Sequence, residues 1–288
     1  MKDVLCYSID AESKEGSVIA RKFNVTGFPT LLFLEPDGSV RDVIGGFLPP
    51  EPFTAEVKRI KKNEFTLTSL RKQIEDSPLD LEVRWRFAQK LLGLGDEDGY
   101  DEQVAFIKEN DPEGKSLGSR SLRFQELKQE SLDAMELQEV YDFLEKETDA
   151  DLLLDGWYFL FKVESYLADN HEDPAKRPEH RRLQISAARA LWSHVPETLL
   201  LRVSGEIVAV FMNAPEEELS HDHKRLLLEV GKTAAKAAPA DPSMLALYGQ
   251  CLFAAGRKED AVSQLQKCVE IDPKNARWRD MLARFQKD

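Results

Sequence analysis

The sequence of 288 residues is poor in cysteine, and Cys6, Cys251 and Cys268 form no Cys-x-x-Cys pair. An odd count without paired spacing argues against a disulfide framework. Each of the three lies in an apolar stretch, which is typical of a buried thiol that packs as a small hydrophobe. No apolar run approaches the roughly 20 residues of a membrane-spanning helix. We therefore expect neither redox chemistry at paired thiols nor membrane association.

A signal peptide is also missing from the start of the sequence, because Met1-Lys2-Asp3-Val4 passes directly into a strand-like segment. This predicts a cytoplasmic protein, or a periplasmic one if the true N-terminus lies upstream. Positive charge is scarce, with a formal net charge of -13 overall and of -17 within residues 63–223. Acidic surface repels phosphate, so we expect no nucleic-acid partner. A solvated acidic surface is the simpler interpretation of this charge, and a basic peptide partner is the alternative.

Strand and turn signals fill the first 62 residues. Alternating or continuous apolar runs predict strands over residues 4–9, 30–34 and 39–44, and helical spacing predicts a short helix over 17–23. The run at 30–34 is almost wholly apolar, as expected for a strand covered on both faces. Glu35-Pro36-Asp37-Gly38 supplies a hairpin turn, and Pro52 starts an amphipathic helix.

Helical periodicity replaces the strand signals from Asn63 onward. Apolar stripes predict helices over 81–95, 137–147, 155–169 and 183–196, and further helices near 200–212 and 224–238. The predicted fold class is therefore an α+β module over residues 1–62, followed by an all-α helical array over 63–288.

The order of elements in the first segment resembles the C-terminal part of the thioredoxin fold. The resemblance rests on "SIDAES", "FNVTGFPTLLFLEPDGSV" and "IGGF". It implies a cis proline at Pro29, and a loop of Phe28, Pro29 and Thr30 that contacts an extended substrate chain. A cis bond occurs at about 5–6% of X-Pro positions, so this implication is testable.

The same resemblance shows what this segment does not contain. Thioredoxins carry a Trp-Cys-x-x-Cys motif upstream of the strand that matches residues 4–9, where a helix terminus lowers a thiol pKa. The missing half also includes the strand between those that match 4–9 and 30–34, so two apolar strand edges are left open. Three explanations remain: the start was assigned at an internal Met, a partner chain completes the sheet, or the two strands pair directly. We interpret Cys6 as a structural thiol of the first strand.

Residues 242–275 form one 34-residue unit that resembles a tetratricopeptide repeat. Residues 276–287 would then be its capping helix. The residues that match the repeat's small, turn, large apolar and closing positions are Gly249, Ala261, Cys268, Gly256, Leu245, Leu252, Leu265 and Pro273. The middle of the chain has helix pairs without these signature residues.

Candidate chemistry is sparse elsewhere. His221 and His223 diverge by about 200° on a helix, so they are better explained as a solvated helix start than as ligands of one metal ion. We expect no catalytic residue, no metal site and no cofactor. Two hypotheses follow. The first is a protein- or peptide-binding protein whose thioredoxin-like module is non-catalytic in this chain; the second is a thiol-disulfide oxidoreductase whose Cys-x-x-Cys half is missing from the given sequence.

Overall fold

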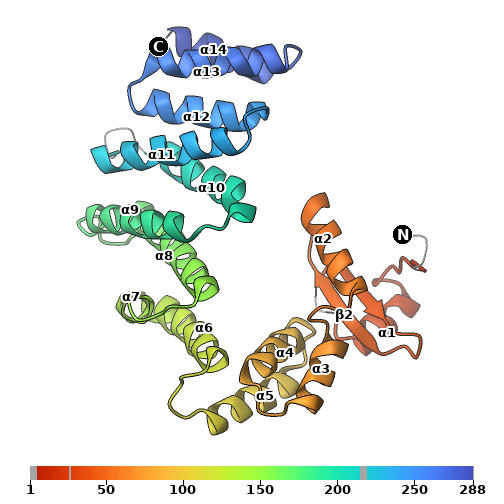
Figure 1. Cartoon of the computed structure of the whole chain (residues 1–288). Helices are drawn as coiled ribbons and strands as arrows, with labels where there is room; N and C mark the ends of the chain where they lie inside the picture. The colour runs from red at the N-terminus through yellow and green to blue at the C-terminus, as the bar shows by residue number, and fades with distance from the viewer. Residues whose placement is uncertain (1–4, 26, 215–218, 288) are drawn as a thin grey trace. The chain divides into compact units, whose positions relative to one another are not determined.

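The computed structural model describes residues 5–25, 27–214 and 219–287, and the chain divides into two compact units, Met1–Glu130 and Ser131–Asp288. The first unit starts with a small α+β segment and continues as helices, whereas the described part of the second unit is helical (Figure 1). This is the predicted fold class. The domain boundary predicted at residue 62 stays a prediction.

The α+β segment consists of helix α1, a two-stranded antiparallel sheet and helix α2. Their bounds are α1 Lys14–Lys22, β1 Thr30–Leu34, β2 Val40–Gly45 and α2 Pro50–Lys61. The register pairs Thr30 with Gly45 and is irregular after Phe33. Gly38 closes the hairpin turn at a φ of 85°, a left-handed conformation that glycine adopts without steric cost. The short helix, the hairpin and the second helix all form, although α1 begins before the predicted residue 17 and α2 before Pro52.

The strand predicted at residues 4–9 is wrong for the described residues. Val4 lies outside them, and residues 5–9 belong to no strand. Leu5, Tyr7 and Ile9 are 86%, 84% and 50% exposed. Strand β1, expected to be covered on both faces, is only half-buried. Both differences have one cause, because no strand of the described chain lies between residues 5–9 and β1 to pair with them.

The helices that follow α2 are α3 Leu67–Asp76, α4 Leu81–Gly93, α5 Glu97–Asn110 and α6 Leu117–Ala134, the last of which continues past Glu130. Helices α3 and α4 pack against strand β2 of the sheet. Thr66, Asp80 and Asp96 cap the first three by accepting hydrogen bonds from backbone N–H groups of the first turn. Val40 of β2 joins the buried cluster of α3 and α4. The sheet therefore buries its face with the help of helices that follow residue 62.

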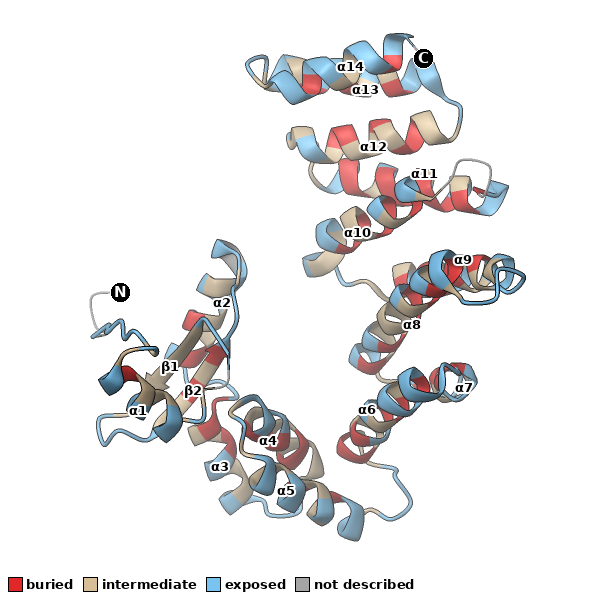
Figure 2. Ribbon diagram, turned by 180° about the vertical axis from the view of Figure 1, so that it is seen from behind, coloured by how far each residue is buried: buried red, intermediate tan, exposed pale blue. Residues whose placement is uncertain are grey.

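The second unit is a series of helices with buried residues between neighbours (Figure 2). Their bounds are α7 Gln138–Leu144, α8 Ala150–Asn170, α9 Arg177–His194, α10 Leu200–Asn213, α11 His221–Ala237, α12 Pro242–Ala254, α13 Lys258–Ile271 and α14 Ala276–Lys287, with one turn of 3-10 helix at Glu197–Leu199. Helices α11 to α14 lie one beside the next (Figure 1). Every helix named in the sequence analysis of this region is present. Within the described residues, no helix is long and apolar enough to cross a membrane.

Candidate functional site

The loop before β1 presents the residues that the thioredoxin resemblance singles out. The Phe28–Pro29 peptide bond is cis, as the resemblance implies. The Oγ1 of Thr30 donates a hydrogen bond to the carbonyl oxygen of Gly27 at 2.6 Å, which closes the loop on itself. Phe28 is 67% exposed, so a large aromatic ring stands in solvent at the tip. That Phe28, Pro29 and Thr30 contact a substrate chain stays a prediction.

Strand β1 has one edge without a partner among the described residues. The N–H of Gly46 donates to the carbonyl oxygen of Pro29 at 2.8 Å, which identifies Pro29 as a position that faces β2. Hydrogen-bonding direction alternates along an antiparallel strand. The backbone groups of Thr30 and Leu32 therefore point to the open edge, immediately after the exposed Phe28.

A hollow of about 220 Å³ adjoins this loop, and we call it the loop hollow. Its walls come from the segment after α1, from both strands and from the end of α4. The residues that line it are Phe23, Asn24, Val25, Gly27, Phe28, Thr30, Leu32, Val43, Gly45, Gly46, Gly93 and Leu94. Sequence reasoning missed Gly93 and Leu94, because α4 reaches the loop only through the tertiary packing of the first unit.

Ionic contacts fix the hairpin that carries the loop. Asp42 of β2 is fully buried and accepts hydrogen bonds from Arg59 Nη2 at 2.6 Å and from Lys90 Nζ at 2.8 Å. Glu35 pairs with Arg41 across the turn at 2.6 Å, and this hydrogen bond lowers the pKa of the Glu35 carboxyl. The hairpin that follows Phe28 is thus tied to both α2 and α4.

The cysteines are not gathered into a dithiol in the part of the chain that the structure describes. Cys251 and Cys268 are buried, as expected, and burial raises their pKa values to about 12 and about 11, away from the nucleophilic thiolate. Cys6 is exposed, which corrects its interpretation as a packed strand thiol. Cys6 is exposed because residues 5–9 form no strand in the described structure, so no sheet covers its side chain.

Helices α12 and α13 form the predicted repeat. The predicted large and small positions lie in one buried cluster with the cap helix: Leu245, Leu252, Ala261, Leu265, Cys268, Trp278 and Phe285. Gly249 lies where a Cβ would be 3.4 Å from Leu265, and Gly256 turns the chain at a φ of 77°. Phe253 of α12 stacks on Phe285 of α14 at 4.1 Å between ring centroids. The last helix covers the exposed face of the repeat, as a cap must.

The two histidines at the start of α11 have different environments. His221 is exposed, but His223 is buried, which corrects the prediction that both are solvated. Ser220 and His223 form a capping box, and the ring of His223 packs edge-on against Phe211 at 5.0 Å. Among the described residues, no group of three or more His, Cys, Asp or Glu side chains is arranged to hold a metal ion.

Comparisons with known proteins agree with both resemblances. A family model for a thioredoxin-like domain matches residues 3–61, and a model for the tetratricopeptide repeat matches residues 228–285. The second match is wider than the unit of 242–275 and takes in parts of α11 and α14. The chain therefore carries a thioredoxin-like segment and a tetratricopeptide repeat.

Whole-chain comparisons add little to this. The crystal structure of a thermophilic TPR protein from Thermus thermophilus is similar at 15% identity, covering 83% of this chain and 98% of that one with a TM-score of 0.34. A likeness at that TM-score carries no weight for the fold or the function. No curated protein matches the chain significantly.

Proposed function

We propose that this chain is a protein-interaction protein, in which a non-catalytic thioredoxin-like segment and a tetratricopeptide-type helical array both act through contact. The observation that carries the proposal is the open edge of β1 directly after the exposed Phe28. An open strand edge offers unpaired N–H and C=O groups that a second extended chain satisfies by adding a strand.

The partner is a protein or peptide in extended conformation. Its backbone pairs with Thr30 and Leu32, and its alternate side chains contact Phe28 and the exposed apolar residues Leu5 and Tyr7. Such a strand takes the place of the one that separates residues 5–9 from β1 in the complete thioredoxin fold. A partner chain that completes the N-terminal sheet is thus the form of contact we favour.

The thiol chemistry of the chain supports a non-catalytic segment. Disulfide exchange needs an accessible thiolate and a second thiol to resolve the mixed disulfide. Cys251 and Cys268 are buried with raised pKa values, and Cys6 has no cysteine close to it in sequence. We expect no insulin-reduction activity from this chain with dithiothreitol as reductant. Measurable turnover above that of a Cys6→Ser variant would favour the oxidoreductase alternative instead.

The binding proposal is tested with the S-carboxymethylated B chain of insulin, an unstructured peptide that cannot exchange disulfides. We expect the full chain to bind it, and Phe28→Ala to weaken binding roughly 10-fold or more, in the range of an aromatic anchor at an interface. Phe47→Ala is the matched control, because Phe47 is another exposed aromatic residue and lies beyond the end of β2.

A second arm uses the same peptide with alternate backbone N–H groups methylated. Methylation removes the donors that pair with β1 and leaves the side chains in place, so we expect binding to be lost. Equal binding of the methylated and unmethylated peptides would contradict strand addition.

A further inference from the structure

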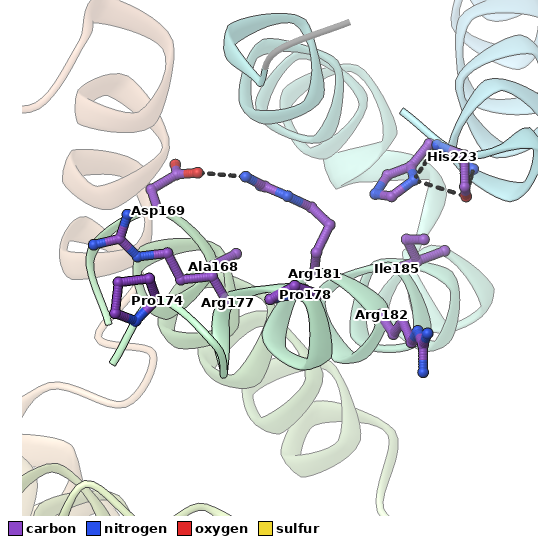
Figure 3. Close-up of a pocket in the computed structure, with 10 residues that line it drawn as sticks. Ala168, Asp169, Pro174, Arg177, Pro178, Arg181, Arg182, Ile185 and His223 are labelled. Carbon is purple, nitrogen blue, oxygen red and sulfur yellow. Dashed lines mark hydrogen bonds and ion pairs between the residues drawn. The ribbon is translucent and has the colours of Figure 1, made fainter. Parts of the chain in front are cut away.

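A second hollow, of about 610 Å³, lies in the second unit between the end of α8, the first turns of α9 and the start of α11 (Figure 3). We call it the arginine pocket. Its polar wall contains Arg177, Arg181, Arg182, Asp169 and His223. Its apolar wall is made by Ala168, Pro174, Pro178 and Ile185. The volume falls in the usual range of small-molecule sites, about 300–1,000 Å³.

His223 presents an unsatisfied donor to this pocket. The backbone N–H of Ser220 donates to Nδ1 of His223 at 3.1 Å, so Nδ1 is an acceptor. In the neutral ring the hydrogen therefore resides on Nε2. The residue is only 1% exposed, and its Nε2 has no hydrogen-bond partner. A buried N–H without an acceptor is destabilising, so an acceptor at this point would stabilise the structure.

Two charged residues act on His223: Arg181, whose charge lowers its pKa, and Asp222, whose charge raises it. Arg181 rises from α9 between Asp169 and His223 (Figure 3), and it pairs with Asp169 at 2.5 Å and with Gln184 at 3.2 Å. Burial is the main cause of the lowered pKa of His223, and the positive charge of Arg181 lowers this pKa further. A guanidinium and an imidazole N–H are both donors, so neither satisfies the other.

Arg177 and Arg182 add two more positive charges at the rim. Arg177 uses Nε to donate to the carbonyl oxygen of His171, and its guanidinium lies beside Pro174 (Figure 3). Within the described residues, neither arginine has an acidic partner. Asp169 is the only carboxylate among the described lining residues.

We propose that the arginine pocket binds an oxyanion, a carboxylate or phosphate group on a compact apolar body. The anion accepts from His223 Nε2–H and lies in the field of the three arginines, while its apolar body contacts Pro178 and Ile185. Guanidinium groups bind both types of oxyanion through paired hydrogen bonds. This site lies in the second unit and is independent of peptide binding at β1, so failure of either proposal leaves the other intact.

The test is an NMR titration of the full chain with ¹⁵N-labelled histidine. The probes are benzoate, phenyl phosphate and the neutral benzamide, at constant ionic strength because salt screens exposed charges. We expect at least one anion to shift the His223 Nε2–H signal saturably, and benzamide to leave it unchanged. Tighter binding of benzoate would identify a carboxylate as the preferred group, and tighter binding of phenyl phosphate would identify a phosphate. An unchanged signal with both anions, or an equal shift with benzamide, would overturn the proposal.

A pair of variants separates specific binding from general loss of charge. Arg182→Gln is expected to weaken the tighter anion roughly 10- to 100-fold, as for loss of one charged hydrogen bond. Arg279→Gln removes the same charge from an exposed position on α14 and is expected to have no effect. Equal weakening by both variants would mean that the pocket does not recognise the anion.

Discussion

At the scale of single residues, His223 couples the stability of the second unit to pH. Burial, assisted by the charge of Arg181, lowers its pKa to about 4 from the ordinary value near 6.5. Between these values the unfolded chain binds a proton at His223 and the folded chain does not. The free energy of unfolding therefore rises with pH across this window, and the contribution is complete above pH 6.5.

We expect acidification from pH 7 to pH 4 to remove about 2–3 kcal/mol of stability through His223. Urea unfolding followed by far-UV circular dichroism at several pH values measures this. His223→Gln should flatten the pH dependence, whereas His221→Gln, at the exposed neighbouring position, should not. Parallel pH profiles for the two variants would show that His223 titrates normally in the folded chain.

Asp42 is the residue on which the hairpin depends. It is fully buried and neutralises Arg59 and Lys90, whose side chains are themselves largely covered. Removing the carboxylate takes away the counter-charge of Lys90 and leaves Arg59 paired with Glu56 alone, so Asp42→Ala should destabilise the first unit by about 3 kcal/mol. Glu82→Gln, which breaks an exposed pair with Arg86, should cost less than about 0.5 kcal/mol.

Asp42→Ala and Glu82→Gln are compared by amide hydrogen exchange of β1 and β2, because exchange at these strands reports on the hairpin alone. Asp42→Ala should speed exchange at Leu31 and Phe33, the positions of β1 that face β2. Similar exchange in the two variants would mean that the buried ion pairs do not hold the hairpin.

At the scale of elements, glycine determines how closely α11 and α12 approach. A Cβ on Gly231 would lie 2.8 Å from Cys251 Sγ and 3.2 Å from the Cα of Tyr248, so the helices must separate to admit it. A Cβ on Gly249 would meet Leu265 at 3.4 Å, an ordinary contact.

Gly231→Ala should therefore destabilise the second unit by about 1–3 kcal/mol through overpacking. Gly249→Ala should be neutral or stabilise by up to about 1 kcal/mol, because alanine favours the helix. The midpoint of thermal unfolding distinguishes the two. A larger loss from Gly249→Ala would contradict the packing described here.

Helix periodicity made most elements predictable. The helices named from apolar spacing form, and the Pro-Asp-Gly turn forms because both features depend on residues adjacent in sequence. The strand predicted at residues 4–9 is wrong over the described residues 5–9, for the opposite reason. A strand needs a partner to satisfy its backbone, and the alternation of Leu5, Tyr7 and Ile9 indicates only that these side chains share a face.

The candidate sites were predictable to different degrees. The cis bond of the loop of Phe28, Pro29 and Thr30 could be expected from sequence because its motif is contiguous, and the substrate-contacting role of the loop stays a prediction. Gly93 and Leu94 of the loop hollow, and the burial of His223, depend on helices that approach only in the folded chain. The one local signal for His223 was Ser220 three residues earlier, the spacing of a capping box.

At the scale of the whole molecule, the two units carry different binding features. The first has a strand edge without a partner among the described residues, and the second has a capped helical repeat and the arginine pocket. We propose that each of these features acts by binding, the strand edge to an extended peptide and the arginine pocket to an oxyanion.

The most direct test of strand addition is amide exchange along β1 in the full chain, with and without the carboxymethylated insulin B chain. Thr30 and Leu32 should exchange rapidly in the free protein and slow on binding, while Leu31 and Phe33, already bonded to β2, should change little. A peptide that binds without slowing Thr30 and Leu32 would contradict the account.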